Sequence, residues 1–237
     1  YEARVLLGLR TTSGDLAGEI VERRRVAVCR PDIEAALERF RGPISQIPPM
    51  YSALKQQGEP LYRIARRGGV VSRQPRAVHV SMLSLLDFRG DEIDLRIECS
   101  KGTYIRVLAE DLGAALGCEA TLARLRRTGV GGFRVDAAHS LETLEGMTPQ
   151  ERLDALLPVD AGLSELPRLE LPAEDAMRLR QGQAVDLAAA QAQMASVRLY
   201  EQGPGRFIGL GQTTRGTLRA LRLISDAGPA ECSQSYK

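Results

Sequence analysis

The sequence predicts an α+β protein: a mixed or antiparallel sheet with flanking helices, followed by a smaller β-rich domain. Residues 78–86 and 93–99 have the residue pattern of strands, while residues 105–116 have apolar side chains at helical spacing. The chain has 237 residues, 43% of them hydrophobic and 26% charged, which is enough for one large domain or two smaller ones.

The first part of the chain predicts two strands and a helix. Residues 1–9 and 20–28 alternate polar and apolar side chains, with a loop between them. Pro31 suits the first turn of a helix, where its missing N–H is not needed, and apolar residues then recur at helical spacing until Gly42.

A proline-rich segment and a basic helix follow. Residues 42–55 contain three prolines, which disfavour regular structure and favour an extended loop. A helix is predicted from Pro60 until the glycine pair at 68–69, with its apolar residues on one side. Its other side carries three arginines: Arg63, Arg66 and Arg67.

The middle of the chain predicts a β-hairpin and two helices. Polar residues 87–92 suit a turn between the strands, and the second strand leads to Lys101. Thr103 is a predicted N-cap for the helix over residues 105–116, and a further short helix is predicted over residues 120–127.

The last part of the chain predicts a second domain. Helices are expected from Ser140 and Thr148, before an acidic connecting stretch interrupted by prolines. We expect one domain over residues 1–165, a small β domain over residues 166–225, and a loose tail over residues 226–237.

Composition excludes several classes of function. No apolar run is long enough for a membrane span and no secretion signal is present, so a cytoplasmic location is expected. The four cysteines are widely scattered and there are only two histidines, which argues against a metal site, and we expect no cofactor. The net charge is +2, yet residues 51–90 hold seven basic residues against two acidic ones.

Candidate chemistry lies between Lys101 and Arg106, where a predicted strand leads into a predicted helix. The Tyr104 ring could stack on a base, and Arg106 could hold a carboxylate. The residues alone leave a second interpretation open, in which Tyr104 packs in the core and Arg106 pairs with Glu110 one helical turn later.

Family resemblance favours the first interpretation. Lys-Gly-Thr-Tyr-Ile-Arg at residues 101–106 closely resembles a signature segment of TruB-type pseudouridine synthases. Residues 46–55 resemble the RNA-gripping thumb loop of that family, and residues 122–128 resemble its substrate-pocket leucine with the arginines that follow. Residues 7–18 match a further family stretch, although Thr12 stands where the family has aspartate. Residues 179–223 more weakly resemble a PUA-like RNA-binding domain.

The resemblance implies the pseudouridine synthase catalytic fold and isomerisation of one T-loop uridine of tRNA, at position 55, to pseudouridine. The base would be flipped out of its stack, and neither a metal nor an organic cofactor would be needed. The essential family aspartate lies in a G-x-x-D-P-x-A-x-G motif upstream of the first strand, and this motif is absent from the sequence. Residues 1–237 alone are therefore expected to be inactive, and a non-catalytic RNA-binding or tRNA-folding protein remains the alternative.

The resemblance also implies residue roles. Tyr1 and Tyr104 would contact the flipped uracil, Leu125 would close the pocket, and Arg106 would orient the family aspartate. Asp15 is a second possible partner for Arg106. We expect a monomer that binds the tRNA T-arm, partly through a thumb over residues 43–75. The basic residues predicted to contact RNA are Lys55, Arg63, Arg66, Arg67, Lys101, Arg126 and Arg127.

Overall fold

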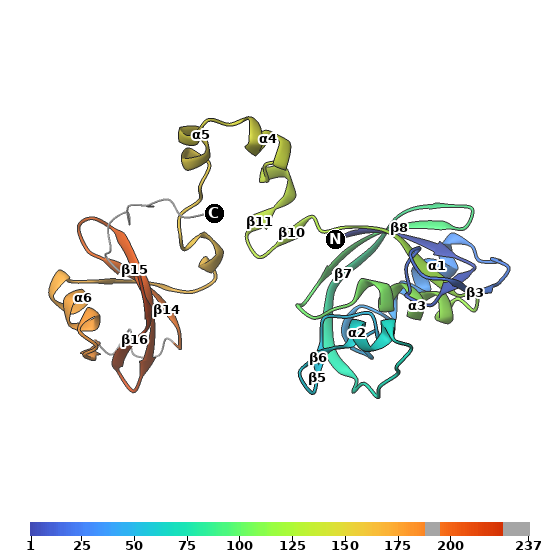
Figure 1. The fold of residues 1–237 in the computed structure, drawn as a ribbon, viewed down its shortest axis with the longest axis horizontal. Coiled ribbons are helices and arrows are strands. Elements are labelled where there is room, and N and C mark those ends of the chain that lie inside the picture. Colours follow the sequence, from blue (N-terminus) through green and yellow to red (C-terminus); the bar gives the residue numbers. More distant parts are fainter. Residues whose placement is uncertain (188–194, 225–237) are drawn as a thin grey trace. The chain divides into compact units, whose positions relative to one another are not determined.

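The computed structural model describes residues 1–187 and 195–224 and divides the chain into two compact units. The first unit is Tyr1–Val130 and the second is Gly131–Lys237 (Figure 1). The domain boundary predicted near residue 165 thus falls inside the second unit. Within the described ranges, no helix is both long and apolar enough to cross a membrane.

The first unit is built on a five-stranded sheet in which every neighbouring pair is antiparallel, with the order β4-β7-β8-β1-β9. The predicted hairpin is confirmed: its two strands, β7 and β8, are the longest of this sheet and pair with each other. The five strands are β4 (Gly42–Gln46), β7 (Arg76–Arg89), β8 (Glu92–Cys99), β1 (Glu2–Leu7) and β9 (Ala120–Arg126).

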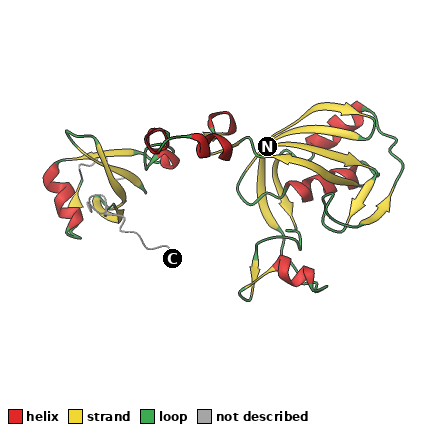
Figure 2. Cartoon of the chain, turned by 45° about the horizontal axis from the view of Figure 1, so that its top comes forward, coloured by secondary structure: helices red, strands yellow, loops and turns green. Residues whose placement is uncertain are grey.

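Helices α1 (Arg30–Glu38) and α3 (Ile105–Ala115) pack against this sheet (Figure 2). Both helices were expected from apolar periodicity, and their buried residues join alternate residues of β1 in one core. The predicted N-cap was wrong by one residue: Tyr104 occupies that position, while the Thr103 hydroxyl donates to the Ser100 carbonyl at 2.9 Å. Thr103 therefore closes the preceding turn.

The segment predicted as a helix over residues 120–127 is strand β9. Val5 of β1 lies opposite Leu122, and Ala3 lies opposite Leu125, with an extra residue of β9 between these pairs. Such a β-bulge brings two leucines three residues apart onto the same face. The bulge adds one residue to the two-residue period of a strand, so the spacing of Leu122 and Leu125 is the three residues typical of a helix. Pairing with β1 makes the segment a strand.

Two small hairpins complete the first unit, together with the short strand β10 (Gly129–Val130). Strands β2 (Leu9–Thr11) and β3 (Ile20–Arg23) form one of them, so the strand predicted over residues 20–28 ends early. Strands β5 (Lys55–Gln56) and β6 (Glu59–Pro60) join helix α2 (Leu61–Arg66) in a lobe that projects from the sheet (Figure 2). Residues 43–46 of the predicted thumb belong to β4, so we call residues 47–75 the thumb lobe.

The second unit begins with several short elements, which are β11 (Phe133–Arg134), η1 (Val135–Ala137), α4 (Leu141–Gly146), α5 (Pro149–Asp154) and η2 (Ala161–Leu163). Two of them, α4 and α5, are the helices predicted from Ser140 and Thr148. In α5, Thr148 and Glu151 form a reciprocal capping box, which explains where this helix starts.

A small mixed sheet forms the rest of the second unit, in the order β12-β14-β15-β16-β13, with only β12 and β14 parallel. The β-rich end predicted from the sequence is confirmed, and the predicted tail lies outside the described residues. The elements are β12 (Arg168–Leu171), α6 (Ala173–Arg180), β13 (Val185–Asp186), β14 (Val197–Glu201), β15 (Arg206–Thr214) and β16 (Thr217–Leu223).

Candidate functional site

The sheet topology brings two predicted pocket residues, Tyr1 and Leu125, to one end of the first unit. Because β1 is antiparallel to both β8 and β9, its first residues lie beside the last residues of those strands. The Tyr1 nitrogen donates to the Ile97 carbonyl at 2.7 Å, and the Ile97 N–H donates to the Tyr1 carbonyl at 2.9 Å. Leu125 lies opposite Ala3 near the end of β9, with 48% of its surface exposed.

The turn between β8 and α3 places Tyr104 and Arg106 at this same end. Gly102 has a φ of +84°, a left-handed conformation that glycine adopts without a side-chain clash. Tyr104 has extended backbone angles as the N-cap of α3, and Arg106 then lies in the first helical turn. A strand-to-helix turn therefore presents an aromatic ring and a guanidinium two residues apart.

Arg106 is the hub of the site. Its Nη1 atom donates to the carbonyl of Ser13 and to Oδ2 of Asp15, each at 3.0 Å, and its Nη2 atom donates to the carbonyl of Tyr51 at 2.6 Å. These contacts join the loop after β2, the thumb lobe and helix α3. The sequence left two carboxylate partners open for Arg106, Asp15 and Glu110. The structure shows the ion pair with Asp15.

The Asp15 carboxylate is held in place by its own loop. Its Oδ1 atom accepts from the Ser13 hydroxyl at 2.6 Å and from the Ala17 N–H at 3.1 Å, while Oδ2 faces Arg106. A Cβ atom on Gly18 would lie 2.4 Å from the Ser13 hydroxyl oxygen, so this tight loop requires a glycine there. Both carboxylate oxygens are thus engaged in holding the loop and the guanidinium.

Glu110 lies beneath the same loop and has a different environment. Its carboxyl group would be within 2.9 Å of a Cβ atom on Gly14, so the two segments are closely packed. Burial raises the pKa of Glu110, and the neighbouring Asp111 carboxylate raises this pKa further. The Arg106 guanidinium has the opposite effect and lowers this pKa, but the ion pair that the structure shows for Arg106 is with Asp15, at 3.0 Å.

The basic residues predicted to contact RNA are exposed. Arg67 in the thumb lobe is paired with Glu59 at 2.7 Å, and the Arg66 guanidinium lies 5.6 Å from the centre of the Tyr62 ring. The Arg73 side chain donates to the Pro48 carbonyl at 3.0 Å, which ties the two ends of the thumb lobe together. The exposed basic residues are Lys55, Arg63, Arg66, Arg67, Lys101, Arg126 and Arg127.

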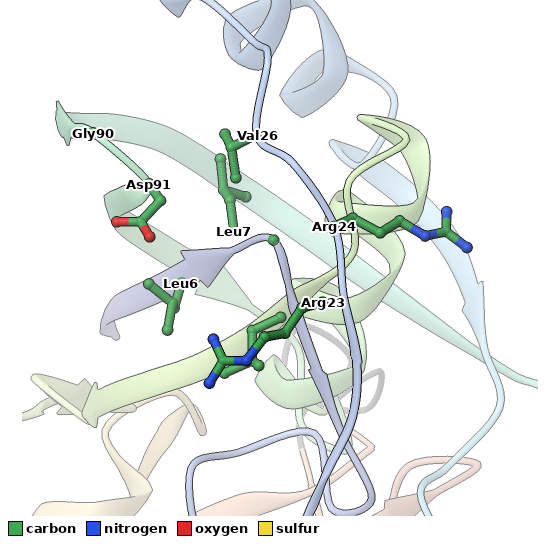
Figure 3. A pocket seen from close by; sticks show the side chains of 9 residues that line it. Leu6, Leu7, Arg23, Arg24, Val26, Gly90 and Asp91 are labelled. Carbon is green, nitrogen blue, oxygen red and sulfur yellow. The ribbon is translucent and has the colours of Figure 1, made fainter.

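A separate hollow of about 500 Å³ lies where β1, β3 and the β7–β8 turn meet (Figure 3). Arg23, Arg24 and Asp91 are its charged residues, and none of the predicted site residues lines it. Arg24 already forms ion pairs with Glu22 at 2.7 Å and Glu119 at 3.4 Å. Because this hollow contains none of the predicted site residues, we place the candidate site around Arg106.

Two site residues were missed by sequence reasoning in the roles that they have here. Ser13 supplies both a carbonyl to Arg106 and a hydroxyl to Asp15. Gln46, quoted only as part of the thumb loop, is 2% exposed and hydrogen bonds to the backbone of Tyr104. A buried amide at the end of a strand carries no periodic signal, so only the fold identifies it.

Family models match almost the whole chain. The TruB family pseudouridylate synthase N-terminal domain matches residues 1–105, and the tRNA pseudouridylate synthase B C-terminal domain matches residues 106–164. A third model, Pseudouridine synthase II TruB, C-terminal, matches residues 167–224.

Individual proteins give the same result. The tRNA pseudouridine synthase B of Stutzerimonas stutzeri (strain A1501) is 48% identical over 229 residues, which cover 94% of this chain and 74% of the relative. The tRNA pseudouridine synthase B of Chromobacterium violaceum is 45% identical over 231 residues, which cover 97% of this chain and 76% of the relative.

Solved structures support the fold. A chain of a Cbf5-Nop10-Gar1 complex superposes with a TM-score of 0.64 at 20% identity, covering 94% of this chain and 65% of that one. A chain of an H/ACA ribonucleoprotein bound to a substrate RNA gives a TM-score of 0.59 at 18% identity, covering 94% and 66%. With all three models matching in order and close relatives covering the chain, this protein belongs to the TruB family of pseudouridylate synthases.

Proposed function

We propose that this protein isomerises the T-loop uridine of tRNA, at position 55, to pseudouridine. In this reaction the bond from the sugar to nitrogen 1 of uracil breaks and a bond from the sugar to carbon 5 forms. The hydrogen of carbon 5 is released to solvent and nitrogen 1 gains a proton, so no oxidant, reductant or co-reactant is consumed. The relatives named tRNA pseudouridine synthase B support this substrate.

The observation that carries the proposal is the hydrogen-bonding arrangement of Arg106. A guanidinium has five N–H donors, and three hydrogen bonds to Ser13, Asp15 and Tyr51 are formed within the described residues. Donors remain for a second carboxylate, so Asp15 can hold Arg106 while Arg106 orients the aspartate that the family resemblance implies. Asp15 itself is a support rather than the nucleophile, because both of its oxygens are engaged.

The remaining pocket residues suit a flipped uracil. A base that leaves its stack loses stacking energy, and stacking on an aromatic side chain returns about 1–3 kcal/mol. Tyr104 and Tyr1 would contact the base, and Leu125, with 48% of its surface exposed at the sheet end, would close over it. We further propose that the thumb lobe and the exposed basic residues hold the T-arm phosphates.

We assign the parts of the chain accordingly. Residues 1–165 would form the catalytic part and residues 166–225 a PUA-like RNA-binding domain, in a monomeric protein acting in the cytoplasm. The short β strands of the second unit and the family match over residues 167–224 support a separate role for that region.

The test uses the complete natural protein and a T-arm stem-loop RNA with tritium at carbon 5 of uridine. Tritium release with formation of pseudouridine is expected, and an RNA with cytidine at the target position should release none. Binding of the RNA without tritium release would instead favour a non-catalytic tRNA-binding protein.

A further inference from the structure

Gln46 lies at the junction between the sheet and the thumb lobe, and its side chain faces the candidate site. It is the last residue of β4, paired with Arg76 of β7, and only 2% of its surface is exposed. Ile47, the next residue, is 53% exposed. The chain therefore passes from the core to the surface at this point, and Gln46 stays on the buried side.

The Gln46 side-chain amide forms hydrogen bonds with both the N–H and the carbonyl of Tyr104. Its Oε1 atom accepts from the Tyr104 N–H at 3.0 Å, and its Nε2 atom donates to the Tyr104 carbonyl at 3.3 Å. The Tyr104 carbonyl also accepts from the Leu108 N–H at 3.1 Å in the first turn of α3. Only one orientation of the amide satisfies both groups, because an N–H must meet an oxygen and a carbonyl must meet an NH₂ group.

The other end of the same proline-rich loop holds Arg106. The Tyr51 carbonyl accepts from Arg106 Nη2 at 2.6 Å, five residues after Gln46. The loop over residues 46–51 is thus fixed at both ends to a segment of three residues, Tyr104 to Arg106. These are the residues that the proposed function requires to be fixed relative to the flipped base.

We infer that Gln46 is a positioning residue for this site, and that its amide sets the backbone of Tyr104 and so the direction of the ring that meets the base. This inference rests on the proposed function for the role of Tyr104. Two hydrogen bonds from one rigid amide to one residue restrict both the position and the rotation of that peptide segment. Displacing a substrate-contacting group by about 1 Å can cost about a hundredfold in rate.

The first variant is Gln46→Met, made in the complete natural protein, which is the parent for every comparison below. Methionine keeps the length of the side chain and removes both hydrogen bonds. We expect kcat on the T-arm RNA to fall about ten- to a hundredfold, with KM changed by less than about threefold because phosphate contacts are retained. The matched control is Thr121→Val. Thr121 is fully buried in β9, and its hydroxyl donates to the Leu9 carbonyl at 3.0 Å, so the control loses a buried hydrogen bond away from Tyr104.

The second variant, Gln46→Glu, separates positioning from packing by its pH profile. A protonated carboxyl group can donate to the Tyr104 carbonyl and accept from its N–H, as the amide does, whereas a carboxylate can only accept. The ratio of kcat for Gln46→Glu to kcat for the parent should therefore approach one at low pH and fall as pH rises. This comparison also serves if Gln46→Met does not fold.

Hydrogen exchange provides a readout that does not depend on activity. The amide of Tyr104 should exchange at least about tenfold faster in Gln46→Met than in the parent or in Thr121→Val. Unchanged exchange, or a kcat within twofold of the parent and no pH dependence in the Gln46→Glu ratio, would overturn the inference. If the parent protein forms no pseudouridine, the proposed function is wrong and the Gln46–Tyr104 contact has no catalytic role. Hydrogen exchange at the Tyr104 amide would still show whether Gln46 holds the Tyr104 backbone.

Discussion

The guanidinium of Arg106 and the carboxylate of Asp15 meet at 3.0 Å, although 91 residues separate them in the sequence. Both side chains are partly buried, with 22% and 31% of their surfaces exposed. Ion pairs of this kind lie between exposed pairs, which contribute little, and buried pairs, whose disruption is costly. The pair therefore matters through the position of Arg106 more than through its own stability.

Replacing Asp15 with asparagine tests this relationship. The amide keeps an acceptor for the loop but removes the charge beside Arg106, so we expect a loss of about 1 kcal/mol in the free energy of unfolding and at least about a tenfold loss in kcat. Urea unfolding and single-turnover kinetics measure the two effects. The control is Asp136→Asn, in an ion pair with Arg134 that is more than 70% exposed on both sides. RNA binding, stability and kcat all unchanged in Asp15→Asn would contradict the assignment.

The basic side of the thumb lobe is tested by replacing Arg63 and Arg66 together with alanine. If both bind phosphate, tRNA affinity should fall and the salt dependence of log Kd should flatten by about one unit for each phosphate interaction that is removed, whatever the target base. Filter binding at several salt concentrations measures the slope. Arg39→Ala, at the exposed end of α1, is the control. An unchanged slope would mean that these arginines form only a solvated helix face.

Asp160 is buried in the second unit, and we expect it to make the free energy of unfolding depend on pH. Its carboxylate accepts from the Tyr200 hydroxyl and from Arg198 Nη1 at 2.8 Å, and these contacts lower its pKa, with the Tyr200 hydrogen bond as the largest cause. A lowered folded-state pKa means that the stabilisation is complete above the unfolded-state pKa of about 4. It is then lost as pH falls through the folded-state pKa.

The variant Tyr200→Phe tests this cluster. It keeps the ring that packs edge-on against Phe207 at 5.5 Å and removes the hydroxyl. We expect a loss of about 1.5–3 kcal/mol at neutral pH, since the hydrogen bond is to a charged group, and a smaller difference from the parent in acid. Thermal unfolding of the complete protein across this pH range, with exchange in β14 as the local readout, measures both. An equal difference at every pH would contradict the prediction.

Gly113 sets the distance between helix α3 and strand β9. A Cβ atom there would lie 2.2 Å from the Ala120 nitrogen and 2.3 Å from the Glu119 carbonyl carbon, both of which are backbone atoms. Gly113→Ala should therefore force the two elements apart and destabilise the protein by about 1–3 kcal/mol or more. Gly146→Ala in α4 is the control. Among the described residues, no atom beyond its chain neighbours and its own helix backbone lies within 4 Å of the Cβ position, so this change should be neutral or stabilising. Chemical denaturation midpoints decide between these outcomes.

Local patterns predicted most of the elements of the first unit. Helix α3 and the β7–β8 hairpin follow from side-chain periodicity, because each buries one face against the rest of the core. The same reasoning failed at β9, where the bulge between Leu122 and Arg124 produced a helical spacing within a strand. The strand is selected by hydrogen bonds to β1, about 120 residues earlier in the chain, and no local pattern contains that information.

The sequence by itself determined the family, through the motif at residues 101–106, the thumb loop and their order. It also predicted a basic thumb and a pocket around Tyr104 and Arg106. The tertiary structure decided which groups hold that pocket: Asp15 rather than Glu110 beside Arg106, and Gln46 at Tyr104. The physical reason is that hydrogen bonds depend on distance and direction in space, and partners 58 and 91 residues apart meet only once the sheet has folded.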